Sequence, residues 1–346
     1  MTGSSGGWPP ERPFRWRDGE RLIRFSSGAL AEAPELLAEH GFDDYVLLST
    51  DRARDAVPDL VRRATMVVAV PPGRVDEISG ALLLEMEGEM DSLVAVGGGR
   101  VIDTTKAIAG AMGGRCAAIP TTLSGAELTA FHRLPAGVEG AQMVRPALVL
   151  ADPELMASAP AAGLAASAMN AMAHAMEALY TPLAGPVTDL AALRAAALLA
   201  EGVGADPPGR EALGLGAVLA GYASGSTGIA VHHALCQTIV RTAGTPHAET
   251  NAVMLPHSAR LMATRAPQAM GELARALGDA AADPGTVAGR LSPLAARCGH
   301  TRLATLGVSE EQLPRVSAAV SEHPLLANTP HPPGEAELLV LLREAL

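Results

Sequence analysis

The sequence predicts an α/β N-terminal domain built on a parallel sheet, followed by an all-α C-terminal domain. Up to about residue 153, short continuous apolar runs alternate with helical patterns, as strands covered on both faces of a parallel sheet do. Beyond Asp152-Pro153 the chain is rich in Ala and Leu, helical in period and poor in strand signals. At 346 residues, the chain is also too long for one small core. We therefore expect a flexible arm over residues 1–19, an α/β domain over 20–153 and a helical domain over 154–346.

The individual elements of the α/β domain follow from these runs and from the breaks between them. Pro71-Pro72-Gly73, for example, separates an apolar strand from the helix after it. Helices are expected over Leu30–His40, Val75–Met90 and Val101–Met112. Strands are expected over Leu22–Phe25, Tyr45–Ser49, Met66–Val70, Leu93–Val96, Cys116–Pro120 and Ala147–Ala151.

Composition narrows the class of function. The net charge of -11 offers no basic surface for nucleic acid. No apolar run is as long as a membrane span, and the N-terminus lacks the apolar core of a signal peptide. The three cysteines are scattered without a CxxC pair, which favours a reducing compartment. We expect a cytoplasmic protein that acts on a small molecule, with neither nucleic acid nor membrane as a partner.

A glycine turn is the first candidate for a binding site. The expected strand Leu93–Val96 runs into Gly97-Gly98-Gly99, and a helix follows that carries Asp103 and Lys106. Glycines let a backbone approach a diphosphate closely, and a helix N-terminus presents free N–H groups to it. A triple glycine also serves in ordinary tight turns, but the carboxyl end of a parallel strand is where ligands bind in such folds. Lys106 is the only lysine among 26 basic residues, a weak hint of a role that arginine cannot fill.

Two further strand ends carry polar residues suited to a nucleotide. Thr121, Thr122 and Ser124 follow the strand Cys116–Pro120, where hydroxyl and N–H groups bind phosphate or ribose, or simply form a turn. Asp51 follows the strand Tyr45–Ser49 and is placed to accept from ribose hydroxyls. An N-cap of a helix over Arg52–Val57 explains Asp51 equally well.

Histidines of the C-terminal domain suggest a second site. His233 and Gln237 are four residues apart, as are Asn170 and His174, so each pair shares a helical face. Thr245-Pro246 looks like an N-cap followed by a first-turn proline, which places His247 in the first turn of the next helix. A lone histidine is more often an ordinary polar helix residue, but three of them with an amide on otherwise apolar helices indicate a built site.

The order and spacing of these motifs resemble the iron-containing (group III) alcohol dehydrogenases over roughly residues 20–346. The residues that carry the resemblance are GGGRVIDTTKAIA, IPTTLSGAELT, DPEL, NAMAHAMEALY and HHALCQTIVRTAGTPHAETNAVMLPH. NAMAHAMEALY, HHALC, PHAET and LPH are most similar to the maleylacetate reductase branch. The resemblance implies the dehydroquinate synthase-like architecture, a homodimer, and NAD(H) or NADP(H) held between an α/β domain and a helical catalytic domain.

The resemblance also implies which residues of this chain form the cofactor and metal sites. Gly97, Gly98 and Gly99 would hold the diphosphate, Thr121, Thr122 and Ser124 the diphosphate and nicotinamide ribose, and Asp51 the adenosine ribose. Further candidates for binding the cofactor, on the helix that the glycine turn opens, are Arg100, Asp103 and Lys106. Metal-binding members of the family hold the metal with an Asp and three His. The corresponding positions in this chain are Asn170, His174, His233 and His247.

This chain departs from the family pattern in four places around the site. Asn170 is neutral, which disfavours a hard divalent metal, although three imidazoles can still hold zinc. Gln237 replaces a usual histidine and cannot relay a proton, and Arg100 replaces a usual serine. Ile239-Val240-Arg241 replaces a stretch that usually contains glycine.

Three functional hypotheses follow. The first is an NAD(P)H-dependent reductase of a small, acidic carbonyl or enone substrate, in which a histidine supplies the proton and a metal (zinc or iron) is absent. The catalytic residues would be Asn170, His174, His233, Gln237 and His247. The alternatives are a family member diverted to a non-redox dehydratase, lyase or cyclase reaction, and a non-catalytic dinucleotide-binding protein.

Overall fold

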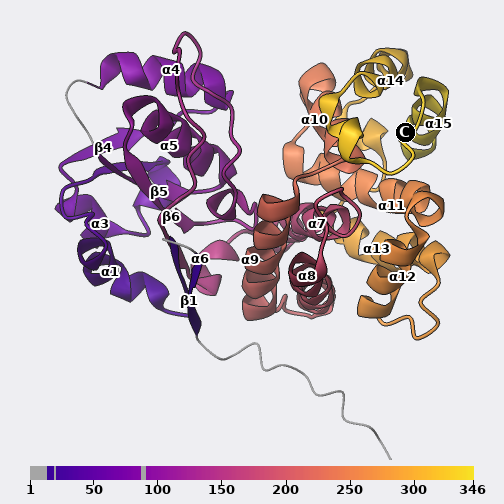
Figure 1. The fold of residues 1–346 in the computed structure, drawn as a ribbon, viewed down its shortest axis with the longest axis horizontal. Helices are drawn as coiled ribbons and strands as arrows, with labels where there is room; N and C mark the ends of the chain where they lie inside the picture. The colour runs from indigo at the N-terminus through magenta and orange to yellow at the C-terminus, as the bar shows by residue number, and fades with distance from the viewer. Residues whose placement is uncertain (1–13, 19–20, 87–90) are drawn as a thin grey trace, which may run out of the picture. The chain divides into compact units, whose positions relative to one another are not determined.

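The computed structural model describes residues 14–18, 21–86 and 91–346, and of residues 14–18 it describes the backbone only. The chain forms two compact units (Figure 1). The first unit comprises residues 1–121, 132–156 and 210–215, and the second comprises residues 122–131, 157–209 and 216–346. The division is therefore not a single cut near residue 153, because residues 122–131 and 210–215 each join the unit that lies on the other side of that boundary in the sequence.

A seven-stranded sheet forms the centre of the first unit, in the order β1-β2-β7-β6-β5-β3-β4. β1 (Phe14–Asp18) runs antiparallel to β2 (Arg21–Phe25), and every other pairing is parallel. The sequence assigns residues 14–18 to a flexible arm, and this part of the expectation is wrong because they pair with β2. Residues 1–13 and 19 of the expected arm lie outside the described residues. The remaining strands are β3 (Val46–Ser49), β4 (Met66–Ala69), β5 (Ser92–Gly97), β6 (Arg115–Pro120) and β7 (Leu148–Ala151).

Helices cover both faces of this sheet, as the continuous apolar strands predict. β3, β5, β6 and β7 are almost entirely buried. Figure 1 shows α1 (Ala33–Glu39) and α3 (Pro58–Arg63) on one side of the sheet and α4 (Val75–Glu85) and α5 (Gly99–Met112) on the other. A hydrophobic core that includes Leu37, Leu47, Leu60, Val94 and Ile119 lies on the α1 and α3 side.

The observed helices refine two expectations and add two short helices between β3 and β4. The segment predicted as a helix over Leu30–His40 begins as a 3-10 turn, Ala29–Glu32, and becomes α-helical at Ala33, next to a proline in its first turn. The helix predicted over Val75–Met90 ends at Glu85, and residues 87–90 lie outside the described part of the chain. Two short helices between β3 and β4, α2 (Asp51–Arg54) and α3, complete the crossover that joins these parallel strands.

The second unit is helical, as predicted. Its helices are α7 (Ala161–Ala178), α8 (Pro186–Gly204), most of α9 (Arg210–Thr227), α10 (Val231–Ala243), α11 (His247–Arg265), α12 (Pro267–Ala276), α13 (Val287–Ala295), α14 (Leu313–Ser321) and α15 (Glu335–Ala345); α6 (Pro153–Met156) belongs to the first unit. α7 is buried on almost every face from Leu164 onward and packs against α8 and α11, which makes it the central helix. Its polar residues are therefore held in the interior.

Within the described residues, no single helix has both the length and the apolar character of a membrane span. α9 and α10 meet that criterion only when taken together, by length and composition, and a bend of 100° separates them.

Candidate active site

The residues expected to bind a dinucleotide follow three adjacent strands of the first unit. β3, β5 and β6 are neighbours in the sheet, and Ser49 pairs with Val96 while Gly97 pairs with Pro120. From β3 the chain moves outward to β4, and from β5 it moves in the opposite direction to β6. The order therefore reverses between β3 and β5. Such a switch point, at the carboxyl ends of the strands, is where doubly wound sheets bind nucleotides.

The glycine turn ends β5 at this switch point and begins α5. Gly98 is the N-cap of α5, and no side chain caps this helix end. The first N–H groups of a helix lack partners within the helix, so they are suited to an anion such as a diphosphate. A Cβ at Gly97 would lie 2.7 Å from Val101 Cβ, too close for any side chain. Gly97 is thus required by the packing of α5 onto its own strand.

Asp51 lies at the other side of the switch point, in the first turn of α2. The N-cap of this helix is Thr50, whose side chain accepts a hydrogen bond from Ala53 N, so the alternative that Asp51 caps the helix is wrong. The Asp51 side chain is 81% exposed and forms an ion pair with Arg54 at 3.0 Å. Its carboxylate is therefore accessible to a ribose hydroxyl.

The helix α5 also carries Arg100, Asp103 and Lys106. Arg100 is exposed in the first turn of the helix. The Lys106 side chain is fully buried, and its Nζ donates to Asp103 Oδ1 at 2.8 Å, while Asp103 is 30% exposed. The only lysine of the chain thus lies in an enclosed, paired environment, which its sequence position alone does not predict.

The hydroxyl-rich segment after β6 divides between the two units. Thr121 belongs to the first unit, and its N–H donates to Gly97 O at 3.0 Å, so it joins the end of β6 to the glycine turn. Thr122 and Ser124 belong to the second unit, which the sequence does not predict. The reason is local: Leu123 N donates to Ser167 Oγ of α7, and a Cβ added at Gly125 would lie 3.6 Å from His174 Nδ1.

The second unit brings together the histidines expected from the sequence. The rings of His174 on α7 and His233 on α10 stack with centroids 4.5 Å apart and planes 5° apart. Asn170 lies one turn before His174 on the same helix and is 5% exposed. Among the described residues, Asn170 Oδ1, His174 Nδ1 and His233 Nε2 are buried and have no hydrogen-bond partner. Buried polar atoms without partners are costly, and they mark a site that a ligand could complete.

Gln237 and His247 lie at the margin of this cluster. Gln237 is half-buried, one turn after His233 on α10. His247 is exposed and is the first residue of α11, with Pro246 as its N-cap. The expected cap, Thr245, instead receives a hydrogen bond from the Thr250 hydroxyl at 2.8 Å. The position of His247 in the first turn is nevertheless as predicted.

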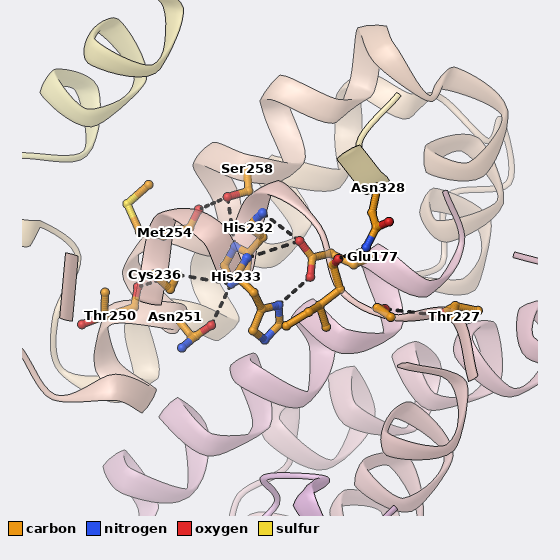
Figure 2. A network of polar contacts seen from close by, with 12 residues as sticks. Glu177, Thr227, His232, His233, Cys236, Thr250, Asn251, Met254, Ser258 and Asn328 are labelled. Carbon is orange, nitrogen blue, oxygen red and sulfur yellow. Dashed lines mark hydrogen bonds and ion pairs between the residues drawn. The ribbon is translucent and has the colours of Figure 1, made fainter. Parts of the chain in front are cut away.

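Glu177 is a component of the site that the sequence analysis did not single out. It lies on α7, three residues after His174, and is fully buried. Its Oε2 lies 2.5 Å from His233 Nδ1, and its Oε1 accepts from His232 N at 2.7 Å and His233 N at 3.3 Å. Figure 2 shows the carboxylate facing the first turn of α10. A carboxylate one turn from a histidine on an apolar helix was the available signal.

His232 is a second residue of the site that the sequence did not indicate. Unlike the ring of His233, its ring has a hydrogen-bond partner at both nitrogens. Its Nδ1 contacts Ser258 Oγ and its Nε2 contacts Asn251 Oδ1, both at 2.9 Å (Figure 2). Asn251 in turn donates to His247 O at 2.7 Å. His232 therefore ties α10 to α11 and leaves neither ring nitrogen free for a ligand.

Burial controls the charge of this cluster. Burial is the main cause that lowers the pKa of His232 and of His233 to about 3. The neighbouring His233 lowers the pKa of His232 further, and His247 does the same to the pKa of His233. The pKa of His174 is also lowered well below 6.5, mainly by burial and then by His233. Burial raises the pKa of Glu177. The three buried histidines are therefore neutral near pH 7 and present nitrogen lone pairs rather than positive charge.

The metal-ligand positions are only partly brought together in this arrangement. Among the described residues, no group of three or more His, Cys, Asp or Glu side chains is placed to hold an ion. His174 and His233 lie face to face, and Asn170 adds no negative charge. Iron(II) favours donor sets with an anionic ligand, which the neutral Asn170 does not supply.

Comparisons with known proteins agree with the fold and the motifs. The profile of the Fe-containing alcohol dehydrogenase family, C-terminal, matches residues 164–346, and the profile of iron-containing alcohol dehydrogenase matches residues 24–160. The chain is 36% identical to maleylacetate reductase 1 of Rhodococcus opacus over 322 residues, covering 87% of this chain and 88% of that protein. It is 32% identical to maleylacetate reductase of Sphingobium indicum over 345 residues, covering 94% and 95%.

A solved structure is also similar to this chain over nearly its full length. The crystal structure of maleylacetate reductase from Agrobacterium tumefaciens superposes with a TM-score of 0.83 at 30% identity, covering 97% of this chain and 98% of that chain.

Proposed function

Because this chain belongs to the iron-containing alcohol dehydrogenase family, in its maleylacetate reductase branch, we propose that it reduces maleylacetate or a closely related acidic enone or carbonyl compound. It is an NAD(P)H-dependent oxidoreductase. The relatives named above are reductases, and no feature of the site favours a lyase or cyclase reaction.

The observation that carries the proposed chemistry is the contact between His233 and Glu177. Because Oε2 of Glu177 engages Nδ1 of His233 at 2.5 Å, the opposite ring nitrogen, Nε2, is left for the substrate. Nε2 is buried and has no partner among the described residues. In the proposed reaction a hydride passes from the nicotinamide to a substrate carbon, and a proton passes from the histidine cluster to complete the reduction.

The remaining residues have supporting roles. The Gly97–Gly99 turn and Thr121 would hold the diphosphate, because they surround an uncapped helix end at the switch point of the sheet. Asp51 would accept from the adenosine ribose hydroxyls and disfavour a 2′-phosphate, which predicts a preference for NADH. Gln237 and Asn170 would orient the substrate through hydrogen bonds, since neither amide exchanges a proton near pH 7.

We further propose that this reaction requires no tightly held metal. The donor set supports this proposal, because a neutral amide at position 170 takes the place of the family's aspartate and the rings of His174 and His233 stack face to face. A nitrogen that coordinates a metal cannot also exchange a proton, whereas a neutral unligated imidazole can. A homodimer and a cytoplasmic location stay predictions from the sequence, and light scattering in solution tests the first.

The test uses protein purified without an affinity tag. NADH consumption is followed with maleylacetate and, as a control, with an uncharged aldehyde. Selective reduction of maleylacetate supports the proposal, and turnover of the aldehyde alone contradicts it. Metal content and activity before and after chelation test the second part. One bound metal per chain, with activity lost on chelation and restored by zinc or iron, would identify a three-histidine metal site instead.

A further inference from the structure

Glu177 closes the N-terminus of α10 from a different helix. Ala230, the N-cap of α10, offers no side chain to the free N–H groups of the first turn. Oε1 of Glu177 accepts two of them, from His232 and His233. An anion at this end of a helix is stabilised by those N–H groups and by the positive end of the helix dipole. The carboxylate is thus suited to stay ionised in a place where burial alone would favour its neutral form.

The same carboxylate determines which ring nitrogen of His233 carries the proton. One proton lies in the 2.5 Å contact between Oε2 and Nδ1. Because Oε1 already accepts two N–H groups, an ionised Glu177 leaves Nδ1 as the donor and Nε2 as the nitrogen with a free lone pair. The side chains of His233 and Glu177 are 3% and 0% exposed, so water does not compete for this contact.

The neighbouring histidines show that this arrangement is specific to His233. His232 starts from the same helix turn, but Ser258 and Asn251 engage both of its nitrogens. His174 stacks on His233, yet none of the described residues forms a hydrogen bond to its Nδ1. Of these three buried histidines, His233 alone combines a carboxylate on one nitrogen with a second nitrogen that has no partner among the described residues.

We propose that Glu177 is a positioning residue for the reduction. It holds His233 in the Nδ1-protonated tautomer, so that Nε2 faces the substrate, and it compensates the positive charge that forms when Nε2 takes up a proton. In the reductive direction, solvent first protonates Nε2, and the ionised Glu177 stabilises the imidazolium that forms. The Nε2–H bond then breaks as the proton passes to the substrate, a bound nicotinamide would supply the hydride, and His233 returns to its neutral, Nδ1-protonated form. This role rests on the proposed function, whereas the tautomer does not depend on it.

The purely structural alternative is that Glu177 serves only to cap α10. Glu177→Gln separates the two roles, because the amide oxygen can still accept from His232 N and His233 N. Its NH₂ group, however, must donate to Nδ1 of His233, which moves the ring proton to Nε2. Replacing the carboxylate of a carboxylate–histidine pair by an amide in this way lowers kcat by about 10⁴ in the serine-protease triad.

The experiment measures tautomer and turnover in the same full-length proteins. We expect ¹⁵N NMR to show His233 protonated at Nδ1 in the parent and at Nε2 in Glu177→Gln. We expect kcat to fall by about 10²–10⁴ in the variant, with the KM for NADH and the melting temperature little changed. Glu344→Gln is the matched control, since it makes the same chemical change in an exposed ion pair with Arg260 and should leave kcat unchanged.

Two outcomes would overturn the inference. A parent protein with His233 protonated at Nε2 would contradict it even if Glu177→Gln does not fold, because this measurement needs neither the variant nor a substrate. A folded variant that keeps the parent's kcat and the Nδ1-protonated tautomer would assign Glu177 to capping alone. If the parent shows the expected tautomer but reduces no test substrate, the proposed function fails while the assignment of the tautomer stands.

Discussion

The buried histidine cluster predicts that the protein loses stability in mild acid. In the unfolded chain these histidines bind protons near pH 6.5, whereas in the folded protein burial keeps His174, His232 and His233 neutral down to much lower pH. The unfolded state therefore binds more protons between about pH 6.5 and pH 3. In that window the free energy of unfolding falls as pH falls, and above it the histidines cause no further change.

The magnitude follows from the pKa difference. With a folded pKa of about 3 and an unfolded pKa of 6.5, a change from pH 7 to pH 5 lowers the free energy of unfolding by about 2 kcal/mol for each of His232 and His233. Glu177 acts in the opposite sense, because its pKa is raised in the folded state, and it offsets at most about 1.4 kcal/mol per pH unit. The two histidines together lose about 4 kcal/mol, of which Glu177 offsets at most about 2.8 over the two pH units, and His174 adds to the loss. We therefore expect a net decrease of at least about 1 kcal/mol.

Urea unfolding between pH 5 and pH 7.5 measures this dependence, and His232→Asn should reduce its slope by up to about 1.4 kcal/mol per pH unit. NMR of the histidine ring protons of the native protein provides a check that needs no variant. Three ring signals should not titrate between pH 7 and pH 5. If every histidine titrates near pH 6.5 while the protein stays folded, or if stability is the same at both pH values, the assignment of a neutral buried cluster is wrong.

Three further predictions concern the first unit. In Gly98→Ala, a Cβ at the N-cap of α5 should crowd the diphosphate and weaken NADH binding at least tenfold, or about 1.4 kcal/mol; an unchanged Kd in the folded variant would refute the site. Asp51→Ala should improve NADPH binding relative to NADH by roughly tenfold, because it removes the carboxylate that repels a 2′-phosphate, and a Kd ratio that does not change would contradict this role. Lys106→Arg should lower the free energy of unfolding by about 1–3 kcal/mol, because a larger guanidinium enters a fully enclosed space; equal thermal stability would show that the enclosure adapts.

Local patterns in the sequence were sufficient for the elements and for several parts of the site. The alternation of apolar runs with helical segments predicts the parallel sheet, because continuous apolar strands are buried on both faces. Spacing by four places His174 with Asn170 on α7, and His233 with Gln237 on α10, since a helix repeats its faces at that interval. The glycine turn is found because a strand, three glycines and a helix are consecutive in the chain.

The rest depended on contacts between distant segments, which no local pattern encodes. The strand order places the chain reversal between β3 and β5, so Asp51 and Gly98 flank one switch point although they are far apart in the sequence. Packing on α7 assigns Thr122 and Ser124 to the second unit even though Thr121, beside them in the chain, belongs to the first.

The chemistry of the histidines was decided in the same way. The sequence alone determined that histidines lie on apolar helices, and the resemblance of their spacing to a known family indicated a site. Only the tertiary structure showed that Glu177 on α7 meets His233 on α10 across 56 positions of the chain, and that burial keeps the imidazoles neutral. A pKa and a tautomer are properties of an environment, and that environment exists only after helices from separate parts of the chain have packed and excluded water.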